Sequence, residues 1–183
     1  MMTERIAHDG AAEGTFEGKK VHIHGMLPDE EGVVEVKKKQ GIFIGALKEI
    51  TKASSRRKLP EETHYLSCSP WQVMEYPLQS ELKQGIVASL FGYYDDAPKA
   101  GYTSATQFYG YRTKVEFSFC DREGENDIPL SLAFHERGGG AHRLPLPQGC
   151  MLASERMNTI ALAITAKLRD QGYVSRDLKT LIV

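Results

Sequence analysis

Glycine recurs throughout the first 50 residues, where it separates short runs that are rich in apolar residues. The positions are Gly10, Gly14, Gly18, Gly25, Gly32, Gly41 and Gly45. Short strands joined by tight turns are typical of small β-barrels, and this spacing leaves little room for a helix. Within residues 21–24 apolar side chains alternate with histidines, so a strand there would place Val21 and Ile23 on the interior face. We therefore predict a small all-β barrel in this region.

Two basic clusters belong to the same region. Residues 33–36 and 42–47 flank a polar KKKQG turn, which predicts a hairpin with Lys37, Lys38 and Lys39 at its tip. The second cluster consists of Lys48, Lys52, Arg56, Arg57 and Lys58, opposed only by Glu49. Either cluster could contact phosphate, and a solvated loop is the alternative. Residues 51–63 lack periodicity and contain Pro60, so we predict a linker there and a second domain from about Glu61.

The rest of the chain mixes helical and strand patterns. Apolar residues at helical spacing predict helices over 77–91 and 154–171, the second opened by Ser154 and closed by Gly172. Residues 111–119 and 130–135 alternate between apolar and polar side chains, as two antiparallel strands joined by the acidic loop 121–127 would. Residues 178–183 are strand-like, and the chain ends inside that run. These patterns predict an α+β domain.

Composition limits the functions to consider. The chain has 183 residues, and its apolar runs fall far short of the roughly 20 residues that span a bilayer. No apolar segment of a secretory signal is present near residue 1, so we expect a cytoplasmic protein. Lys and Arg number 23 against 24 Asp and Glu, so any nucleic-acid site must be local. The widely spaced Cys68, Cys120 and Cys150 favour reduced thiols over a disulfide framework.

The residue spacings of this sequence do not match the motifs of common enzyme classes. Gly14 and Gly18 before Lys19 stand one residue short of a phosphate-binding loop, and the glycine run 138–140 lacks the dinucleotide-binding pattern. His22 and His24 have no further ligand at zinc-site spacing. No nucleophile elbow exists, and Cys120 adjoins only an acidic loop. We assign no catalytic residue.

The polar face of the predicted strands gathers cations and aromatic rings. Its members are Tyr109, Tyr111, Arg112, Lys114, His135, Arg137, His142 and Arg143. Cations neutralise phosphate and aromatic faces stack on unpaired bases, a combination that suits single-stranded or looped RNA. The alternative is a salt-bridged sheet surface in which Glu116 and Glu136 are the partners, and spacing does not separate the two.

Three blocks of the sequence resemble the N-terminal half of the RNA (uracil-5-)-methyltransferases that carry a TRAM domain. The first has the order HDG, GK and LPDE and ends in an S-x-R element. The second is CSPWQVMEYPLQSELKQ, and the third pairs YRTKVEFSF with FHERGGGAHRLPLPQGC. The resemblance implies a β-rich fold, with an OB-like TRAM barrel over 1–58 followed by an incomplete α+β domain over 61–183.

The resemblance also implies a function. Such enzymes flip a uridine out of structured rRNA or tRNA, attack it with a cysteine thiolate, and methylate C5 from S-adenosylmethionine. The cofactor domain would lie beyond Val183, so this chain would bind RNA without methylating it. The implied RNA contacts are Tyr111, Arg112, Lys114, Arg137, His142 and Arg143, with Lys38 and Arg56 from the barrel. A stand-alone RNA-binding or adaptor protein is the alternative.

Some members of this family hold a [4Fe-4S] cluster with four cysteines. Cys68 and Cys150 match two of those positions, and the others are not cysteine in ETHYLSCSPWQ. We therefore expect the cluster to be lost, no other metal to be bound, and Cys150 to be a small buried residue. The helix over 77–91 would pack on the cofactor domain, so we expect Leu82, Leu90 and Phe91 to be partly exposed or buried in a dimer.

Overall fold

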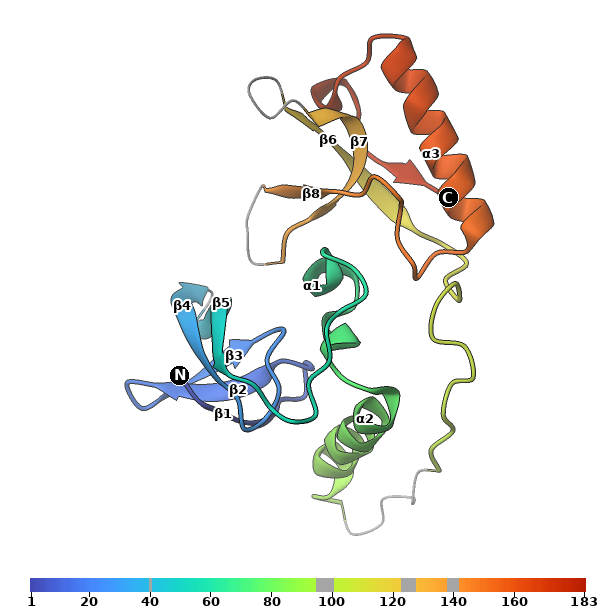
Figure 1. Cartoon of the computed structure of the whole chain (residues 1–183). Coiled ribbons are helices and arrows are strands. Elements are labelled where there is room, and N and C mark those ends of the chain that lie inside the picture. Colours follow the sequence, from blue (N-terminus) through green and yellow to red (C-terminus); the bar gives the residue numbers. More distant parts are fainter. Residues whose placement is uncertain (40, 95–100, 123–127, 138–141) are drawn as a thin grey trace. The chain divides into compact units, whose positions relative to one another are not determined.

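The computed structural model describes residues 1–183 except 40, 95–100, 123–127 and 138–141 (Figure 1). Its secondary structure is β-rich, with two sheets and few helices. The strands are β1 (Thr3–Ile6), β2 (Ala12–Phe16), β3 (Lys19–Ile23), β4 (Glu31–Lys39), β5 (Ile42–Lys52), β6 (Glu116–Arg122), β7 (Ile128–His135), β8 (Arg143–Pro145) and β9 (Leu181–Ile182). The helices are α1 (Tyr65–Cys68), α2 (Tyr76–Phe91) and α3 (Glu155–Asp170), with 3₁₀ turns η1 (Pro70–Val73) and η2 (Ser175–Asp177).

The chain divides into two compact units, each made of two separate stretches of the sequence. Unit 1 comprises residues 1–61 and 69–104, and unit 2 comprises residues 62–68 and 105–183. Segment 62–68, which contains α1, therefore belongs to unit 2, whereas α2 belongs to unit 1. The domains expected from the sequence, 1–58 and 61–183, are defined differently, as parts that would fold independently. That division stays a prediction.

Unit 1 contains a five-stranded sheet that closes on itself. The strand order is β1-β2-β3-β5-β4, and β4 returns to β1 through a bridge between Met2 and Glu31. All neighbours are antiparallel except β3 and β5. Val21 and Ile23 are fully buried, as the alternation predicts, while His22 on the other face lies 2.7 Å from Asp9. The predicted hairpin is confirmed as β4 and β5, although Gln40 at its turn lies outside the described residues.

Steric crowding explains why one position of this sheet, residue 45, is glycine. At Gly45 a Cβ atom would stand 2.5 Å from Cγ1 of Val34 and 2.6 Å from Cγ1 of Ile23. Gly45 pairs with Ile23 across the parallel junction and with Val36 on the other side. Only a residue without a side chain allows the two neighbouring strands to approach β5 at this point.

The predicted linker over 51–63 is wrong in its first half. Strand β5 continues to Lys52, and Arg57 forms a bidentate ion pair with Glu30, whose side chain is fully buried. Oxygens of Glu30 also accept hydrogen bonds from the amides of Leu27 and Ser54. The segment after β5 is thus fixed to the closed sheet by charge, which a search for hydrophobic periodicity does not detect.

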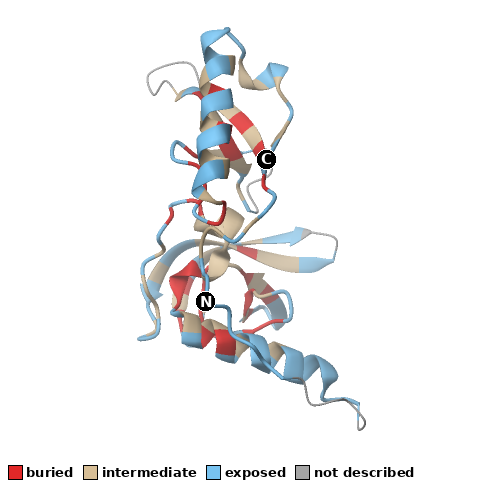
Figure 2. Cartoon of the chain, turned by 90° about the vertical axis from the view of Figure 1, so that its right-hand side faces the viewer, coloured by how far each residue is buried: buried red, intermediate tan, exposed pale blue. Residues whose placement is uncertain are grey.

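Helix α2 confirms the prediction over 77–91 and begins one residue earlier, with Pro77 in its first turn, where no amide hydrogen is needed. Leu78 is buried, and Leu82 and Ile86 pack against the core of the closed sheet. The far end is exposed, as Figure 2 shows, with Leu90 49% and Phe91 54% accessible. The expected partial exposure of this helix is confirmed.

Unit 2 is built on a four-stranded sheet with order β8-β7-β6-β9, in which β6 and β7 form the predicted antiparallel pair. The predicted strand over 111–119 is wrong in its first half, because β6 begins at Glu116. The alternation of side chains continues through residue 115, but Thr113 lies in a bend and Arg112 bridges to Ala153 instead of joining the sheet. The acidic loop's residues 123–127 and the glycine run 138–140 lie outside the described residues.

The core of unit 2 lies between this sheet and α3. Phe117, Leu132 and Leu146 are fully buried there, together with Ala161 of α3. Helix α3 confirms the second predicted helix: the Ser154 hydroxyl caps it by accepting from the amide of Met157, and Gly172 follows it with φ of 81°. The strand-like run at 178–183 contains β9, an edge strand of the sheet.

Candidate functional site

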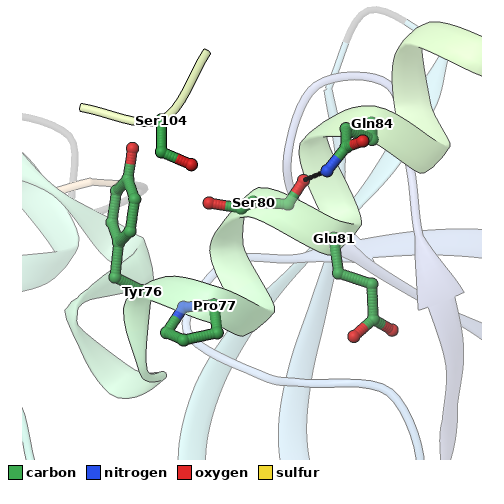
Figure 3. A pocket seen from close by; sticks show the side chains of 6 residues that line it. All are labelled: Tyr76, Pro77, Ser80, Glu81, Gln84 and Ser104. Carbon is green, nitrogen blue, oxygen red and sulfur yellow. Dashed lines mark hydrogen bonds between the residues drawn. The ribbon is translucent and has the colours of Figure 1, made fainter. Parts of the chain in front are cut away.

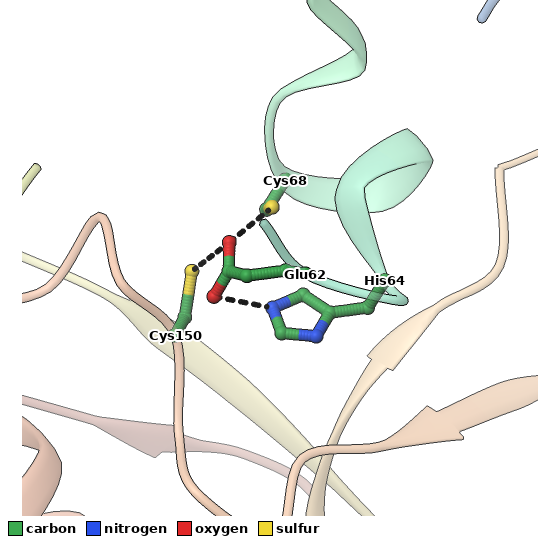
Figure 4. Close-up of side chains that lie close together, drawn as sticks. All are labelled: Glu62, His64, Cys68 and Cys150. Carbon is green, nitrogen blue, oxygen red and sulfur yellow. Dashed lines mark hydrogen bonds and ion pairs between the residues drawn. The ribbon is translucent and has the colours of Figure 1, made fainter. Parts of the chain in front are cut away.

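Four side chains with metal-binding atoms meet inside unit 2 (Figure 4). Glu62 and His64 precede α1, Cys68 is the last residue of α1, and Cys150 lies in the loop between β8 and α3. One ligand atom from each lies within 4.8 Å of the others, and Glu62, His64 and Cys150 are buried. The fold therefore brings together Cys68 and Cys150, which are far apart in the sequence.

The carboxylate of Glu62 is at the centre of this cluster. Its Oε2 atom accepts from the thiol of Cys68 at 3.4 Å and lies 4.0 Å from the sulfur of Cys150. Its Oε1 atom accepts from the amide of Met151 at 2.6 Å and lies 3.0 Å from Nε2 of His64. The approach of His64 lacks hydrogen-bond geometry, so its buried Nε2 atom has no hydrogen-bond partner among the described residues.

Surrounding residues hold the four side chains in place. The His64 ring meets Phe134 edge to face at 5.7 Å, and Phe134 stacks on the fully buried Phe117. The backbone of Cys150 is bound twice by the Asn158 side chain of α3, which accepts from its amide at 3.0 Å and donates to its carbonyl at 2.9 Å. Such outer contacts orient ligand atoms before anything binds.

Close contact within the cluster shifts the pKa values of His64, Cys68 and Cys150. A hydrogen bond from Cys68 lowers the pKa of Cys150 to about 5, with help from His64 and against the effect of burial. The same bond, together with burial, raises the pKa of Cys68. Burial alone would lower the pKa of His64, but its interactions with Cys150 and Glu62 raise it to about 9. The contacts therefore favour the thiolate form of Cys150 and the charged form of His64, each relative to the isolated group.

Sequence reasoning found two members of the cluster and missed two. Cys68 and Cys150 came from the resemblance, and Cys150 is buried as expected. Glu62 and His64 were not singled out, although the spacing Glu-x-His-x₃-Cys in ETHYLSC contained the signal. Two thiols do not meet the four-thiolate requirement of a [4Fe-4S] cluster, so the donor set does not fit that group.

The predicted RNA contacts of unit 2 fall into two groups. Tyr111 and Lys114 are exposed, Arg112 is half-buried, and neither cation forms an ion pair within the described part of the chain. Arg137 and Arg143 instead hold backbone: Arg137 donates to the carbonyl of Leu66 at 2.7 Å, and Arg143 to that of Phe119 at 2.6 Å. His142 lies 3.0 Å from Glu136, one of the two acidic partners expected for a salt-bridged surface.

The predicted contacts of unit 1 also differ from each other. Lys38 lies on the face of the Phe43 ring at 5.9 Å, and Lys19 approaches the same ring at 5.2 Å. Arg56 forms an exposed bidentate pair with Glu81 of α2. Lys37 and Lys48 share Glu35 and lower its pKa to about 2. Of the two predicted contacts, Lys38 thus lies on an aromatic face and Arg56 is paired with a carboxylate.

A surface pocket beside α2 is lined mainly by uncharged side chains (Figure 3). Its lining residues are Tyr76, Pro77, Ser80, Glu81, Gln84 and Ser104. The buried Ser80 hydroxyl has no hydrogen-bond partner among the described residues, and Gln84 donates to the carbonyl of Ser80. None of the predicted contact residues lines this pocket, and we assign no function to it.

A solved structure shares this fold. The fold matches the crystal structure of the Pyrococcus abyssi tRNA (uracil-54, C5)-methyltransferase in complex with S-adenosyl-L-homocysteine, with a TM-score of 0.71 over 99% of this chain. That match covers 41% of the other chain at 11% identity, so it shows the fold alone. No protein-family model matches. None of the described helices is long and apolar enough to cross a membrane.

Curated relatives define the resemblance more closely. An uncharacterized RNA methyltransferase of Oceanobacillus iheyensis is 29% identical over 97% of this chain and 38% of its own length. The 23S rRNA (uracil(1939)-C(5))-methyltransferase RlmD of Shewanella frigidimarina is 27% identical over 90% of this chain and 37% of its own. The resemblance to RNA (uracil-5-)-methyltransferases is thus confirmed, and the chain spans well under half the length of these relatives.

Proposed function

We propose that this chain is the RNA-binding N-terminal portion of an RNA (uracil-5-)-methyltransferase that uses S-adenosylmethionine to form 5-methyluridine in rRNA or tRNA. The observation that carries the proposal is similarity to RNA methyltransferases over nearly the whole chain. The relative from Shewanella is named for a uracil of 23S rRNA, and the structural match for a tRNA uracil with a bound cofactor product. The sheet order and closure of unit 1 support an OB-like TRAM barrel, because OB-folds are small five-stranded barrels that bind oligonucleotides.

Each unit offers one surface for RNA. In unit 2 the segment containing Tyr111, Arg112 and Lys114 presents cations that no carboxylate of the described residues neutralises, next to an exposed ring. In unit 1, Lys19 and Lys38 flank Phe43. Base stacking with phosphate neutralisation at both places would bind looped RNA with little dependence on sequence.

The salt dependence of RNA binding tests the first surface. Arg112→Ala and Lys114→Ala are each expected to remove about one phosphate contact, which flattens the slope of log affinity against log salt by about 0.7–0.9. The measurement is fluorescence anisotropy with a labelled RNA stem-loop at several salt concentrations. Arg169→Ala and Lys167→Ala, which remove exposed cations from the end of α3, are the matched controls.

An unchanged slope in both surface variants, or an equal change in the α3 controls, would contradict this assignment. Arg143 is a less informative position for the test, although it is also a predicted contact. Its guanidinium donates to the carbonyl of Phe119, so Arg143→Ala would perturb the sheet and RNA binding together. The same holds for Arg137, which binds the backbone of α1.

The exposed end of α2 supports a second candidate function, an adaptor that binds protein. Val87, Leu90 and Phe91 are 40–54% exposed on one helix of unit 1. A second copy of this chain could bury them, and sedimentation velocity at micromolar concentration is then expected to show a dimer that Leu90→Ser with Phe91→Ser converts to monomer. Ile160→Ser with Ile164→Ser on α3 is the matched control, because those side chains are 41% and 38% exposed. A wild-type chain that sediments as a monomer would rule the dimer out.

A further inference from the structure

We propose that Glu62, His64, Cys68 and Cys150 bind a single zinc ion, which ties segment 62–68 to the loop before α3. Thiolate sulfur, imidazole nitrogen and carboxylate oxygen are the donors that zinc takes in proteins, and four of them complete a tetrahedral site. All four come from unit 2, so the proposed site lies within one compact unit.

The distances suit one small ion. Zinc lies about 2.3 Å from a thiolate sulfur and about 2.0–2.1 Å from a histidine nitrogen, so tetrahedral geometry separates neighbouring donors by about 3.3–3.8 Å. Oε1 of Glu62 lies 3.0 Å from Nε2 of His64, and Oε2 lies 3.4 Å from the sulfur of Cys68 and 4.0 Å from that of Cys150. Small side-chain adjustments bring the four donors to bonding distance from a common centre.

The same distances exclude an iron–sulfur cube. In a [4Fe-4S] cluster each protein ligand binds a different iron, and the cluster's own atoms fill the space between the ligands. Donor atoms that lie within 4.8 Å of one another leave no room for that body. The side chains present are therefore arranged for a mononuclear ion.

Burial of His64 supports the same conclusion. Its buried Nε2 atom lies 3.0 Å from Oε1 of Glu62 without the geometry of a hydrogen bond, and it points toward the carboxylate and the two sulfurs (Figure 4). Buried polar atoms normally have well-formed hydrogen bonds, and an ion at the centre of the cluster would bind Nε2 directly. In the bound state both sulfurs would be thiolates and Nε2 would be unprotonated, and any protons that these groups carry would be released to solvent.

Four protein donors leave no open position, so the ion would be structural and would not activate water. It would join Glu62 to Cys150, which lie 88 positions apart in the sequence. Contacts already in place would position the ligands: Met151 binds Oε1 of Glu62, and Asn158 fixes the backbone of Cys150.

Metal content of the purified wild-type chain tests the proposal, with protein expressed in zinc-supplemented medium and kept under reductant. We expect about one equivalent of zinc by mass spectrometry and no inorganic sulfide. Cobalt(II) added to the metal-free chain should give the intense visible bands of a tetrahedral site and a thiolate-to-cobalt charge-transfer band. Chelation is expected to lower Tm by about 10 °C or more, and zinc should restore it.

Variants assign the ligands. His64→Ala and the Cys68→Ser, Cys150→Ser double variant should lose the zinc and the cobalt bands, whereas Cys120→Ser, outside the cluster, should keep both. The proposal is overturned if the wild-type chain binds no zinc and shows no cobalt spectrum, if it holds stoichiometric iron and sulfide, or if the double variant retains zinc. The wild-type cobalt spectrum gives a result even where a variant fails to fold.

Discussion

Replacing Glu30 with alanine is expected to destabilise unit 1 by about 3–5 kcal/mol, the usual cost of breaking a buried ion pair by removing one partner. Glu30 is fully buried and binds Arg57 through both carboxylate oxygens, at 2.6 Å and 2.8 Å. The alanine variant would leave a largely buried guanidinium and the amides of Leu27 and Ser54 without their acceptor. Urea unfolding followed by the fluorescence of Trp71 measures the effect, because this single tryptophan donates to the carbonyl of Gly10 within unit 1.

Two comparisons separate the buried charge from a general loss of side chain. Glu81→Ala breaks the exposed Arg56–Glu81 pair, which is also bidentate, and should leave the unfolding midpoint within error of wild type. The double variant Glu30→Met with Arg57→Met should recover much of the stability lost in Glu30→Ala, because it leaves no charge unpaired. A Glu30→Ala midpoint equal to that of Glu81→Ala would contradict the prediction.

The same ion pair contributes to the loss of stability of unit 1 in acid. Burial alone would raise the pKa of Glu30, but hydrogen bonds from Arg57 and two backbone amides lower it below the ordinary value. A depressed pKa means that this stabilisation is complete above about pH 4.3, the unfolded value, and is lost as the pH falls through the folded value. Wild-type stability should therefore fall in acid more steeply than that of Glu30→Gln.

Local patterns were sufficient for most elements of the fold. The polar KKKQG turn between two apolar runs located the β4–β5 hairpin, and period-two alternation located the β6–β7 pair. Capping signals at Ser154 and Gly172 bounded α3 within one residue. The errors lie where a strand-like sequence pattern is not accompanied by strand pairing. Residues 111–115 alternate as a strand does, yet they are not part of a strand, because β6 begins at Glu116. The fixed segment after β5 was missed because its anchor is one buried charge pair between residues 27 positions apart.

The candidate sites depended even more on distant contacts. Cys68 and Cys150 lie on different segments, and Glu62 acquires significance only when the loop before α3 folds back on it. Among the predicted RNA contacts, sequence could not show that Arg143 and Arg137 donate to carbonyl groups while Arg112 and Lys114 lack carboxylate partners among the described residues. Side-chain type was predictable, but the choice between a binding and a structural role requires the partners of each side chain.

Gly149 is the residue on which the position of Cys150 most depends. It has φ of 79°, a conformation that costs a residue with a Cβ atom about 1–2 kcal/mol. A Cβ atom there would also overlap the side-chain amide of Asn158, which must then release both of its hydrogen bonds to Cys150, worth about 1 kcal/mol each. Gly149→Ala is therefore expected to destabilise unit 2 by about 3–4 kcal/mol in total, measured by hydrogen exchange of the β6 and β7 amides.

A double-mutant cycle with Asn158→Ala identifies the cause. Asn158→Ala alone loses the two hydrogen bonds and should cost about 2 kcal/mol. With the amide already absent, alanine at Gly149 meets only the Cβ atom of residue 158, at 3.1 Å, and adds mainly the backbone strain. The double variant should therefore be no less stable than Gly149→Ala, a coupling of about 2 kcal/mol between neighbouring sites. Strictly additive losses would show that Gly149 acts through its backbone conformation alone, and that Asn158 does not link it to the placement of the Cys150 thiol.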